Sequence, residues 1–146
     1  MAIERMLERG QIERVPPSDN LAQSLIDASN AHLVSAATVL DSDPPGAFQL
    51  AYDAARKACA ALLAVQGLRP TTAGGHRAVQ EAMTEQFGSG FSSLGRLRRQ
   101  RNDTEYPDAD SPSTTSDDAA HAIEEAGDIV NAAKALLASG QLTPFR

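Results

Sequence analysis

The sequence predicts an all-α fold, an antiparallel bundle of four or five helices with a short N-terminal helical appendage. The chain of 146 residues contains twenty-six alanines and six aromatic residues, and alanine has the highest helix propensity. Apolar residues recur at helical spacing over several long segments, as is typical of buried helix faces. β-Branched residues nowhere alternate with polar ones over a useful length, so no strand is predicted.

The first predicted elements are a short N-terminal helix and a long helix that opens the main body. Residues 1–9 can form a helix that Gly10 closes, and the prolines at 16–17 enforce an extended break. Ser18 then caps the long helix, because its hydroxyl can accept from the first free amides. The residues expected on its buried face are Leu21, Leu25, Ala28, His32, Leu33, Ala36 and Leu40.

A central helix is predicted after a turn at residues 41–46, and it runs to Gly67. It carries two apolar stripes, which is typical of a helix with neighbours on two sides. One stripe consists of Ala47, Leu50, Ala54, Ala58, Ala61 and Val65, and the other of Phe48, Tyr52, Ala55, Cys59 and Leu62. Cys59 is the only cysteine, so an internal disulfide is excluded and a small core residue is predicted.

Three further helices complete the predicted bundle. After a loop at 69–75, Val79, Met83 and Phe87 mark a shorter helix, and residues 91–106 form an arginine-rich helix that Pro107 stops. A polar break follows, and Ser116 opens the last helix with two acids behind it. The apolar stripe of that helix is Ala119, Ile123, Ala126, Val130, Ala133 and Leu137.

Length and composition limit the organisation of the chain. At this size one domain is predicted, with residues 1–17 as an N-terminal appendage, 18–140 as the helical bundle and 141–146 as a C-terminal tail. No apolar run reaches the length of a membrane span and the N-terminus is charged, so a cytoplasmic protein without membrane association is expected. The three histidines show no i, i+4 pair, so neither a metal nor a cofactor is predicted.

Positive charge is concentrated in the arginine-rich helix, although the net charge of the chain is −6. This balance argues against broad wrapping of nucleic acid. At about 100° per residue, Arg101 lies on the same helix face as Leu94 and Leu97, with Glu105 one turn further on. A guanidinium on that face needs a partner, so Arg101 is singled out.

The same segment resembles the signature of HEPN domains, small helical bundles of prokaryotic defence and toxin-antitoxin systems. Arg101 and Asn102 are followed, after three residues, by Tyr106. In family members that cleave RNA the pattern is Arg, four to six residues, then His. Residues 47–70 and the following Gly75-His76 are similar to the family's alanine-rich second long helix and the Gly-His opening of its next helix. The resemblance covers roughly residues 20–138.

The resemblance implies a candidate site made of Arg101, Asn102 and Tyr106, in a cleft formed by two subunits. Arg101 would recognise phosphate or stabilise charge in a transition state, or it would pair with Glu105 or Asp53 and only fix helix register. Asn102 would bond to substrate or cap a neighbouring helix. Tyr106 would stack on a base, seal an interface or, as the favoured interpretation, pack its ring at the helix end.

The other arginines of the helix are candidate contacts to RNA or to an acidic partner. They are Arg96, Arg98 and Arg99. The alternative, which we favour, is a solvated face neutralised by the six acids between Asp103 and Asp118.

Tyr106 decides how much catalysis the resemblance supports. A histidine exchanges a proton near neutral pH, as metal-independent RNA cleavage requires, whereas a phenol seldom does. The first interpretation is therefore a non-catalytic, homodimeric component of a two-gene toxin-antitoxin or defence module that binds a nucleotidyltransferase-type partner. The second is a metal-independent endoribonuclease toxin with a composite site at its dimer interface, and the third is a structural dimer without a nucleic-acid role. The homodimer is expected because the apolar stripes of the central and last helices need cover.

Overall fold

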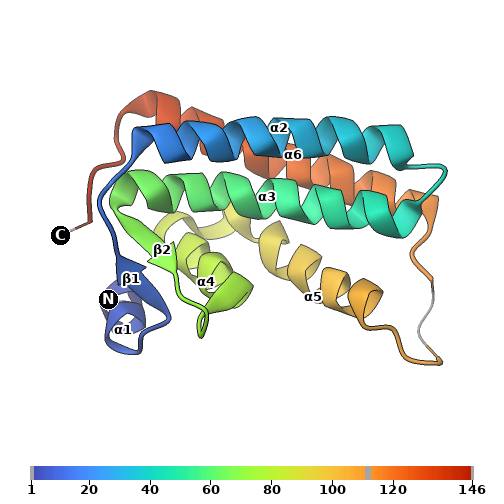
Figure 1. The fold of residues 1–146 in the computed structure, drawn as a ribbon, viewed down its shortest axis with the longest axis horizontal. Helices are drawn as coiled ribbons and strands as arrows, with labels where there is room; N and C mark the ends of the chain where they lie inside the picture. Colours follow the sequence, from blue (N-terminus) through green and yellow to red (C-terminus); the bar gives the residue numbers. More distant parts are fainter. Residues whose placement is uncertain (1, 111–112, 146) are drawn as a thin grey trace.

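Three long helices form the body of the protein (Figure 1). The structure is a computed structural model that describes residues 2–110 and 113–145. Helix α3 (Pro44–Gln66) contacts both α2 (Asp19–Val39) and α6 (Ser116–Ser139). Helices α4 (Gly75–Phe87) and α5 (Ser93–Glu105) lie against another side of α3. The prediction of an all-α bundle is confirmed.

The N-terminal segment contributes to the core of the bundle. Helix α1 spans Ala2–Glu8, and Gly10 follows it with a φ of +69°, a left-handed conformation that glycine adopts without strain. Ile3 and Met6 are buried, and α1 contacts α4. The short helix predicted for residues 1–9 is therefore confirmed within the part of the segment that the structure describes.

A small sheet joins two segments in which no strand was predicted. Strand β1 (Ile12–Arg14) pairs antiparallel with β2 (Leu68–Pro70), and Ile12 lies opposite Pro70. The predicted loop at 69–75 is thus wrong in its first two residues, and also in its last, since α4 begins at Gly75. Strands of three residues are too short to show alternation in a sequence, and this pair forms because tertiary packing buries Ile12 and Leu68.

Helix α2 begins as predicted, and Ala36, Leu25, Leu33 and Leu40 of the predicted face pack in or against the core. The hydroxyl of Ser18 accepts a hydrogen bond from the amide of Leu21 at 3.0 Å, which confirms the predicted cap. The Leu21 side chain, however, is 51% exposed, so its predicted burial is wrong. The buried residues of the helix are Ala22, Ile26, Ser29 and Ala36. Small residues on the inner face let α2 approach α3 closely, and Ser29 donates to the carbonyl of Ala54 on α3 at 2.8 Å.

Helix α3 is the central helix that the two apolar stripes predict. It begins at Pro44, inside the predicted turn, because the carboxylate of Asp43 accepts from the amide of Gly46 at 3.0 Å and caps it. Gly67 ends it with a φ of +74°. Its buried residues come from both stripes and are Ala47, Phe48, Ala51, Tyr52, Ala54, Ala55, Ala58, Cys59, Ala61, Leu62, Leu63, Ala64 and Gln66.

The ends of the later helices differ from prediction by a turn or less. A 3₁₀ helix, η1 (Gly88–Phe91), precedes α5, so the regular arginine-rich helix begins at Ser93 rather than at Phe91. The cap of α6 is Thr115 rather than Ser116, since the Thr115 hydroxyl and the Asp118 carboxylate bond reciprocally to backbone amides.

The buried face of α6 and the C-terminal segment complete the core. In α6 the half-buried Ile123 and Leu137 share the inner face with fully buried residues, which are Ala119, Ala122, Ala126, Ile129, Val130 and Ala133. After α6 the chain returns to α3, where the amide of Phe145 donates to the carbonyl of Gln66 at 2.8 Å. None of the described helices is long and apolar enough to span a membrane.

Candidate functional site

Helix α5 is held against the bundle by a narrow apolar face. Leu94 and Leu97 are buried there, and Gly95 is buried between them. A Cβ atom at Gly95 would lie 2.7 Å from Nε2 of Gln80, so glycine permits the close approach of α4 to α5 at this point. The polar residues of α5 on either side of this face are therefore fixed relative to α3 and α4.

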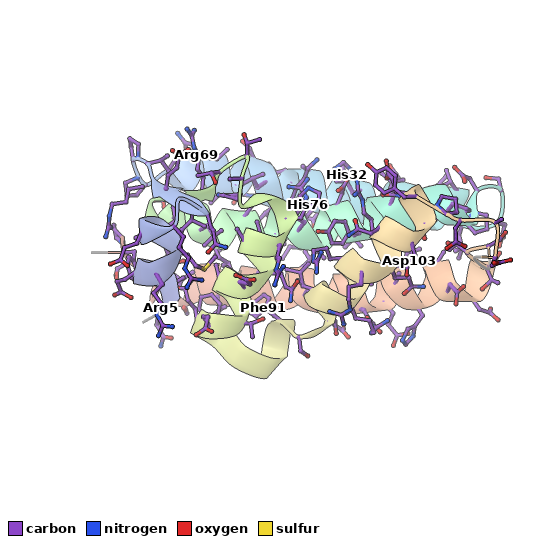
Figure 2. The ribbon with its side chains drawn as sticks, turned by 90° about the horizontal axis from the view of Figure 1, so that it is seen from below. Arg5, His32, Arg69, His76, Phe91 and Asp103 are labelled. Carbon is purple, nitrogen blue, oxygen red and sulfur yellow. The ribbon has the colours of Figure 1, made fainter. Side chains whose placement is uncertain are left out.

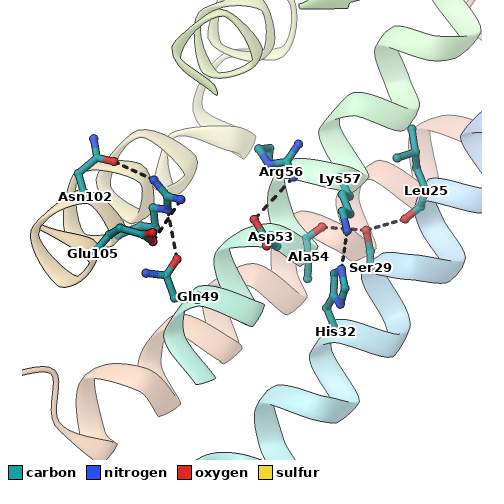
Figure 3. A network of polar contacts seen from close by, with 11 residues as sticks. Leu25, Ser29, His32, Gln49, Asp53, Ala54, Arg56, Lys57, Asn102 and Glu105 are labelled. Atoms are coloured by element: carbon teal, nitrogen blue, oxygen red, sulfur yellow. Dashed lines mark hydrogen bonds and ion pairs between the residues drawn. The ribbon is translucent and has the colours of Figure 1, made fainter. Parts of the chain in front are cut away.

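Arg101 is held at three points (Figure 3). Its Nε donates to Oε1 of Gln49 on α3 at 3.2 Å, and its Nη1 donates to Oδ1 of Asn102 at 3.3 Å. Its Nη2 lies 3.3 Å from Oε2 of Glu105, one turn further along α5. With its side chain only 22% exposed, Arg101 is partly buried as expected, and the predicted ion pair with Glu105 is confirmed.

The alternative partner considered for Arg101, Asp53, belongs to a different ion pair. Oδ1 of Asp53 lies 3.6 Å from Nη2 of Arg56, three residues further along α3. Figure 3 shows both side chains on α3, between Gln49 on one side and Lys57 on the other. Asp53 is therefore not the ion-pair partner that fixes the register of α5.

Tyr106 lies at the very end of α5. Its amide donates to the carbonyl of Asn102 at 2.9 Å, and its backbone then leaves the helical conformation before Pro107. The side chain is 75% exposed. The expected packing of this ring at the helix end is therefore wrong, and the ring is available for contact with another molecule.

The remaining arginines of α5 have separate surroundings. Arg96 forms an ion pair with Glu125 of α6, which also lies 2.7 Å from Nε2 of His121. Arg98 donates from Nε to Oε1 of Gln80 on α4 at 2.9 Å. Neutralisation by the acids between residues 103 and 118 is thus wrong for Arg96, because its partner comes from the neighbouring helix. Arg99 is exposed.

Contacts between α3, α4 and α5 bring further polar groups together beside these arginines. The rings of Tyr52 on α3 and His76 on α4 lie 5.5 Å apart between centroids. The contact between Arg98 and Gln80 is one turn along α4 from His76, and the contact between Arg101 and Gln49 is one turn along α3 from Tyr52. We call the residues that meet here the arginine-histidine cluster. They are Tyr52, Arg56, His76, Arg98 and Arg101 (His76 is labelled in Figure 2). Arg56 is included because it lies one turn along α3 from Tyr52 and its charge acts on both rings.

Burial and nearby charges shift the ionisation of both rings. Burial lowers the pKa of His76, and the charges of Arg56, Arg101 and Arg98 lower it further, against the opposing effect of Asp53. Burial raises the pKa of Tyr52 to about 12, although the same three arginines oppose the shift. His76 is consequently neutral at neutral pH.

Comparison with known protein families matches residues 22–136 to the HEPN domain. The chain belongs to the HEPN family. The matched range begins in α2, ends in α6 and contains the whole of α5. Searches of curated proteins and of solved structures found no match.

Within this HEPN domain, sequence reasoning found the arginines of α5 but missed the groups that α3 and α4 place beside them. Tyr52 was assigned only to an apolar stripe, and Arg56 was not singled out. A usable signal was the row of polar residues along α3, in which Gln49, Asp53 and Arg56 share one face at helical spacing. That signal does not reveal which helix covers the row.

The single cysteine and the possible metal ligands of this HEPN domain bear on two other kinds of chemistry. Cys59 is fully buried and burial raises the pKa of its thiol, so the prediction of a core residue is confirmed. Within residues 2–110 and 113–145, no group of three or more His, Cys, Asp or Glu side chains is arranged to hold a metal ion.

Proposed function

We propose that this HEPN-family protein is the non-catalytic component of a two-gene toxin-antitoxin or defence module and that it binds a nucleotidyltransferase-type protein. The observation that carries the proposal is the residue at the end of the Arg101 motif. Tyr106 occupies the place where RNA-cleaving family members carry histidine, and its exposed ring at the end of α5 suits contact with a partner better than proton transfer.

The hydrogen bonds and ion pair of Arg101 support the same proposal. All three nitrogen positions of its guanidinium are engaged by Gln49, Asn102 and Glu105. An arginine that stabilises a reacting phosphate needs donors directed at that phosphate. In this chain Arg101 instead ties α5 to α3 and so keeps the exposed side of α5 in position.

The partner would contact the outer face of α5, which we define by Arg99, Asp103 and Tyr106. These residues are spaced by four and three positions, so they lie on one side of the helix, and all three are exposed. An aromatic ring flanked by charges of both signs is a frequent composition for a protein contact. Tyr106 would supply the apolar contact, and the two charged residues would supply orientation.

The proposal includes a homodimer. The two apolar stripes of α3 are covered within one chain, so the reason first given for the dimer does not hold for that helix. Helix α2 nevertheless exposes Val34, which is 68% accessible, and Leu21, and a second chain would cover such side chains. Light scattering tests this directly, since a dimer has twice the 15.4 kDa mass of the chain.

The partner is tested by co-expressing the chain with a nucleotidyltransferase encoded by an adjacent gene. We expect the two proteins to elute together and Tyr106→Ala to weaken the complex at least tenfold. Arg77→Ala is the control, because it truncates a side chain that is 74% exposed on another helix. Absence of a complex, or equal weakening by both substitutions, would contradict the proposal.

A further inference from the structure

We propose that a cavity at one end of the bundle is a binding site for a primary aliphatic amine, with the alkyl chain on an apolar floor and the ammonium group beside Asp19. The cavity lies where the start of α2 meets the ends of α3 and α6, at the left of Figure 1. Its volume is about 360 Å³, within the range of roughly 300–1,000 Å³ that is usual for small-molecule sites. The site is separate from the outer face of α5 and goes beyond partner binding.

The floor of the cavity is apolar. Ala22 of α2, Val65 of α3 and Leu137 of α6 contribute to it, together with Leu142 from the segment after α6. Val65, Leu137 and Leu142 are each half-buried, so part of every one of these side chains remains open to solvent. An alkyl chain that covers them removes apolar surface from water, and this favours binding in proportion to the area covered.

Asp19 is the one charged residue in the lining of the cavity. Its carboxylate forms no hydrogen bond or ion pair within the parts of the chain that the structure describes, and the lining contains no lysine, arginine or histidine. The other polar side chain, Gln23, donates from Nε2 to Oδ1 of Asp27 at 2.9 Å. An ammonium group would therefore meet the Asp19 carboxylate without competition from a cation of the lining.

Two helix ends add negative potential at the same place. Helices α3 and α6 both end at the cavity, which Val65, Leu137 and Gly140 line, and neither helix has a basic residue in its last turn. Each helix C-terminus carries about half a negative charge, and the start of α2 contributes about half a positive charge. With the carboxylate of Asp19 the sum stays negative, so the cavity favours a cation.

The composition of the lining selects a cation that carries an apolar chain. One carboxylate and one amide side chain are too few for the six to eight oxygen ligands that a calcium ion takes. A guanidinium presents five donors in a fixed plane, whereas an ammonium group is a compact charge that a single carboxylate can accompany while water takes the remaining donors. A primary alkylamine therefore matches both the apolar floor and the negative rim.

The test is an NMR titration of the full chain that follows the methyl signals of Val65, Leu137 and Leu142. The probes are hexylamine, hexan-1-ol and hexanoate, which share one hydrocarbon chain and differ in the charge of the head group. We expect hexylamine to shift all three residues and to bind about fivefold more tightly than hexan-1-ol, with hexanoate weaker still. Equal affinity of hexylamine and hexan-1-ol would overturn the proposal. So would the absence of any shift with hexylamine at about 10 mM, roughly ten times the ~1 mM upper end of typical substrate affinities.

Asp117→Asn is the matched control for Asp19→Asn. Both aspartates are exposed in the first turn of a long helix, but Asp117 begins α6 at the opposite end of the bundle (Figure 1). Asp19→Asn should weaken hexylamine binding roughly three- to fivefold and leave hexan-1-ol binding unchanged, whereas Asp117→Asn should change either by less than about twofold. Equal weakening of hexylamine by the two substitutions would overturn a defined site. Should Asp19→Asn fail to fold, the comparison of probes on the wild-type chain decides alone.

The role of the apolar floor is tested by the length of the alkyl chain. Ethylamine has the same charge as hexylamine but lacks most of the chain, so it should bind at least roughly tenfold more weakly. Leu142→Ala should weaken hexylamine about two- to fivefold without removing its advantage over hexan-1-ol. Ethylamine that binds as tightly as hexylamine would overturn the proposed orientation of the ligand.

The complex with a protein partner is measured on Asp19→Asn as well. Helix α5, with Tyr106 after it, ends toward the other end of the bundle from the cavity (Figure 1). Asp19→Asn should therefore leave that complex unchanged, so failure of the amine site is separable from failure of the proposed function.

Discussion

Buried polar groups on the two sides of α3 differ in whether they have a hydrogen-bond partner. Toward α2, the hydroxyl of Ser29 is fully buried and lies within hydrogen-bond distance of the carbonyls of Leu25 and Ala54, at 2.9 and 2.8 Å. Toward α4 and α5, Nε of Arg56 is buried without an acceptor among the described residues. The first arrangement stabilises the fold, and the second leaves hydrogen-bonding capacity for a ligand.

Two histidines repeat this contrast. His32 of α2 lies 2.7 Å from Nζ of Lys57 on α3, and burial followed by the charge of Lys57 lowers its pKa. The pKa of His76 is lowered by burial and then by the arginines of the cluster. The neutral His32 ring can accept from Lys57 and is satisfied within the chain, whereas the His76 ring packs beside Tyr52 and forms no hydrogen bond or ion pair among the described residues.

The largest expected loss of stability comes from a substitution on α2. Ile26→Ala should lower the free energy of unfolding by about 2–5 kcal/mol, because Ile26 is 5% exposed in the core and its truncation leaves a cavity. Gln49→Ala, on the other side of α3, removes one hydrogen bond to Arg101 and should cost roughly 1 kcal/mol. Urea unfolding measures both, and a similar cost for the two would remove the distinction between the sides.

The next largest loss of stability is expected for a substitution among the arginines of α5. Arg101→Ala should cost about 1–3 kcal/mol, because a partly buried guanidinium loses its bonds to Gln49 and Glu105. Arg99→Ala should change the free energy of unfolding by less than about 0.5 kcal/mol, since that side chain is exposed. Thermal unfolding of the two variants is the measurement, and equal melting temperatures would contradict the structural role of Arg101.

A change of pH is expected to have a smaller effect on the free energy of unfolding. The pKa values of His32 and His76 are lowered in the folded chain, so below about pH 6.5 the unfolded chain takes up protons that the folded chain excludes. These histidines therefore reduce stability as pH falls from 7 toward 5, and their contribution is fully present above pH 7. His76→Gln should make this dependence shallower in urea unfolding at pH 5 and 7. An unchanged or steeper dependence would show that His76 does not resist protonation.

A small effect on stability is also expected at Arg56. Arg56→Gln should change the free energy of unfolding by no more than about 0.5–1 kcal/mol, because the variant loses only a long ion pair and removes a buried donor that lacks an acceptor. Thermal unfolding tests this. A loss above about 2 kcal/mol would mean that Arg56 serves the fold, as Ser29 does.

Local signals in the sequence predicted most of the fold. The cap at Ser18, the left-handed end at Gly67 and the end of α5 before Pro107 depend on nearby residues, and each lies where predicted. On α2 the burial of Leu21 was wrongly predicted, and the burial of Ala22 and Ser29, small residues that allow close packing, was not predicted. Tertiary contacts, not local sequence, decide such choices.

The candidate site was predictable only where it is contained in one helix. The pair of Arg101 and Glu105 is four residues apart and follows from helical geometry. The approach of Arg56 and His76 to Arg98 depends on how α3, α4 and α5 pack together, and a single sequence does not supply that arrangement. For the same reason Arg96 was expected to face acids nearby in the chain, although its partner is Glu125.

The most direct test of the proposed function is an RNA degradation assay with metal chelated, on wild type, Arg101→Ala and Tyr106→His. The account predicts little or no cleavage by wild type, because general acid-base catalysis contributes about 10² to 10⁴ in rate and Tyr106 does not supply it near neutral pH. Some cleavage is expected in Tyr106→His. Robust wild-type cleavage that disappears in Arg101→Ala would contradict the account and support a HEPN endoribonuclease.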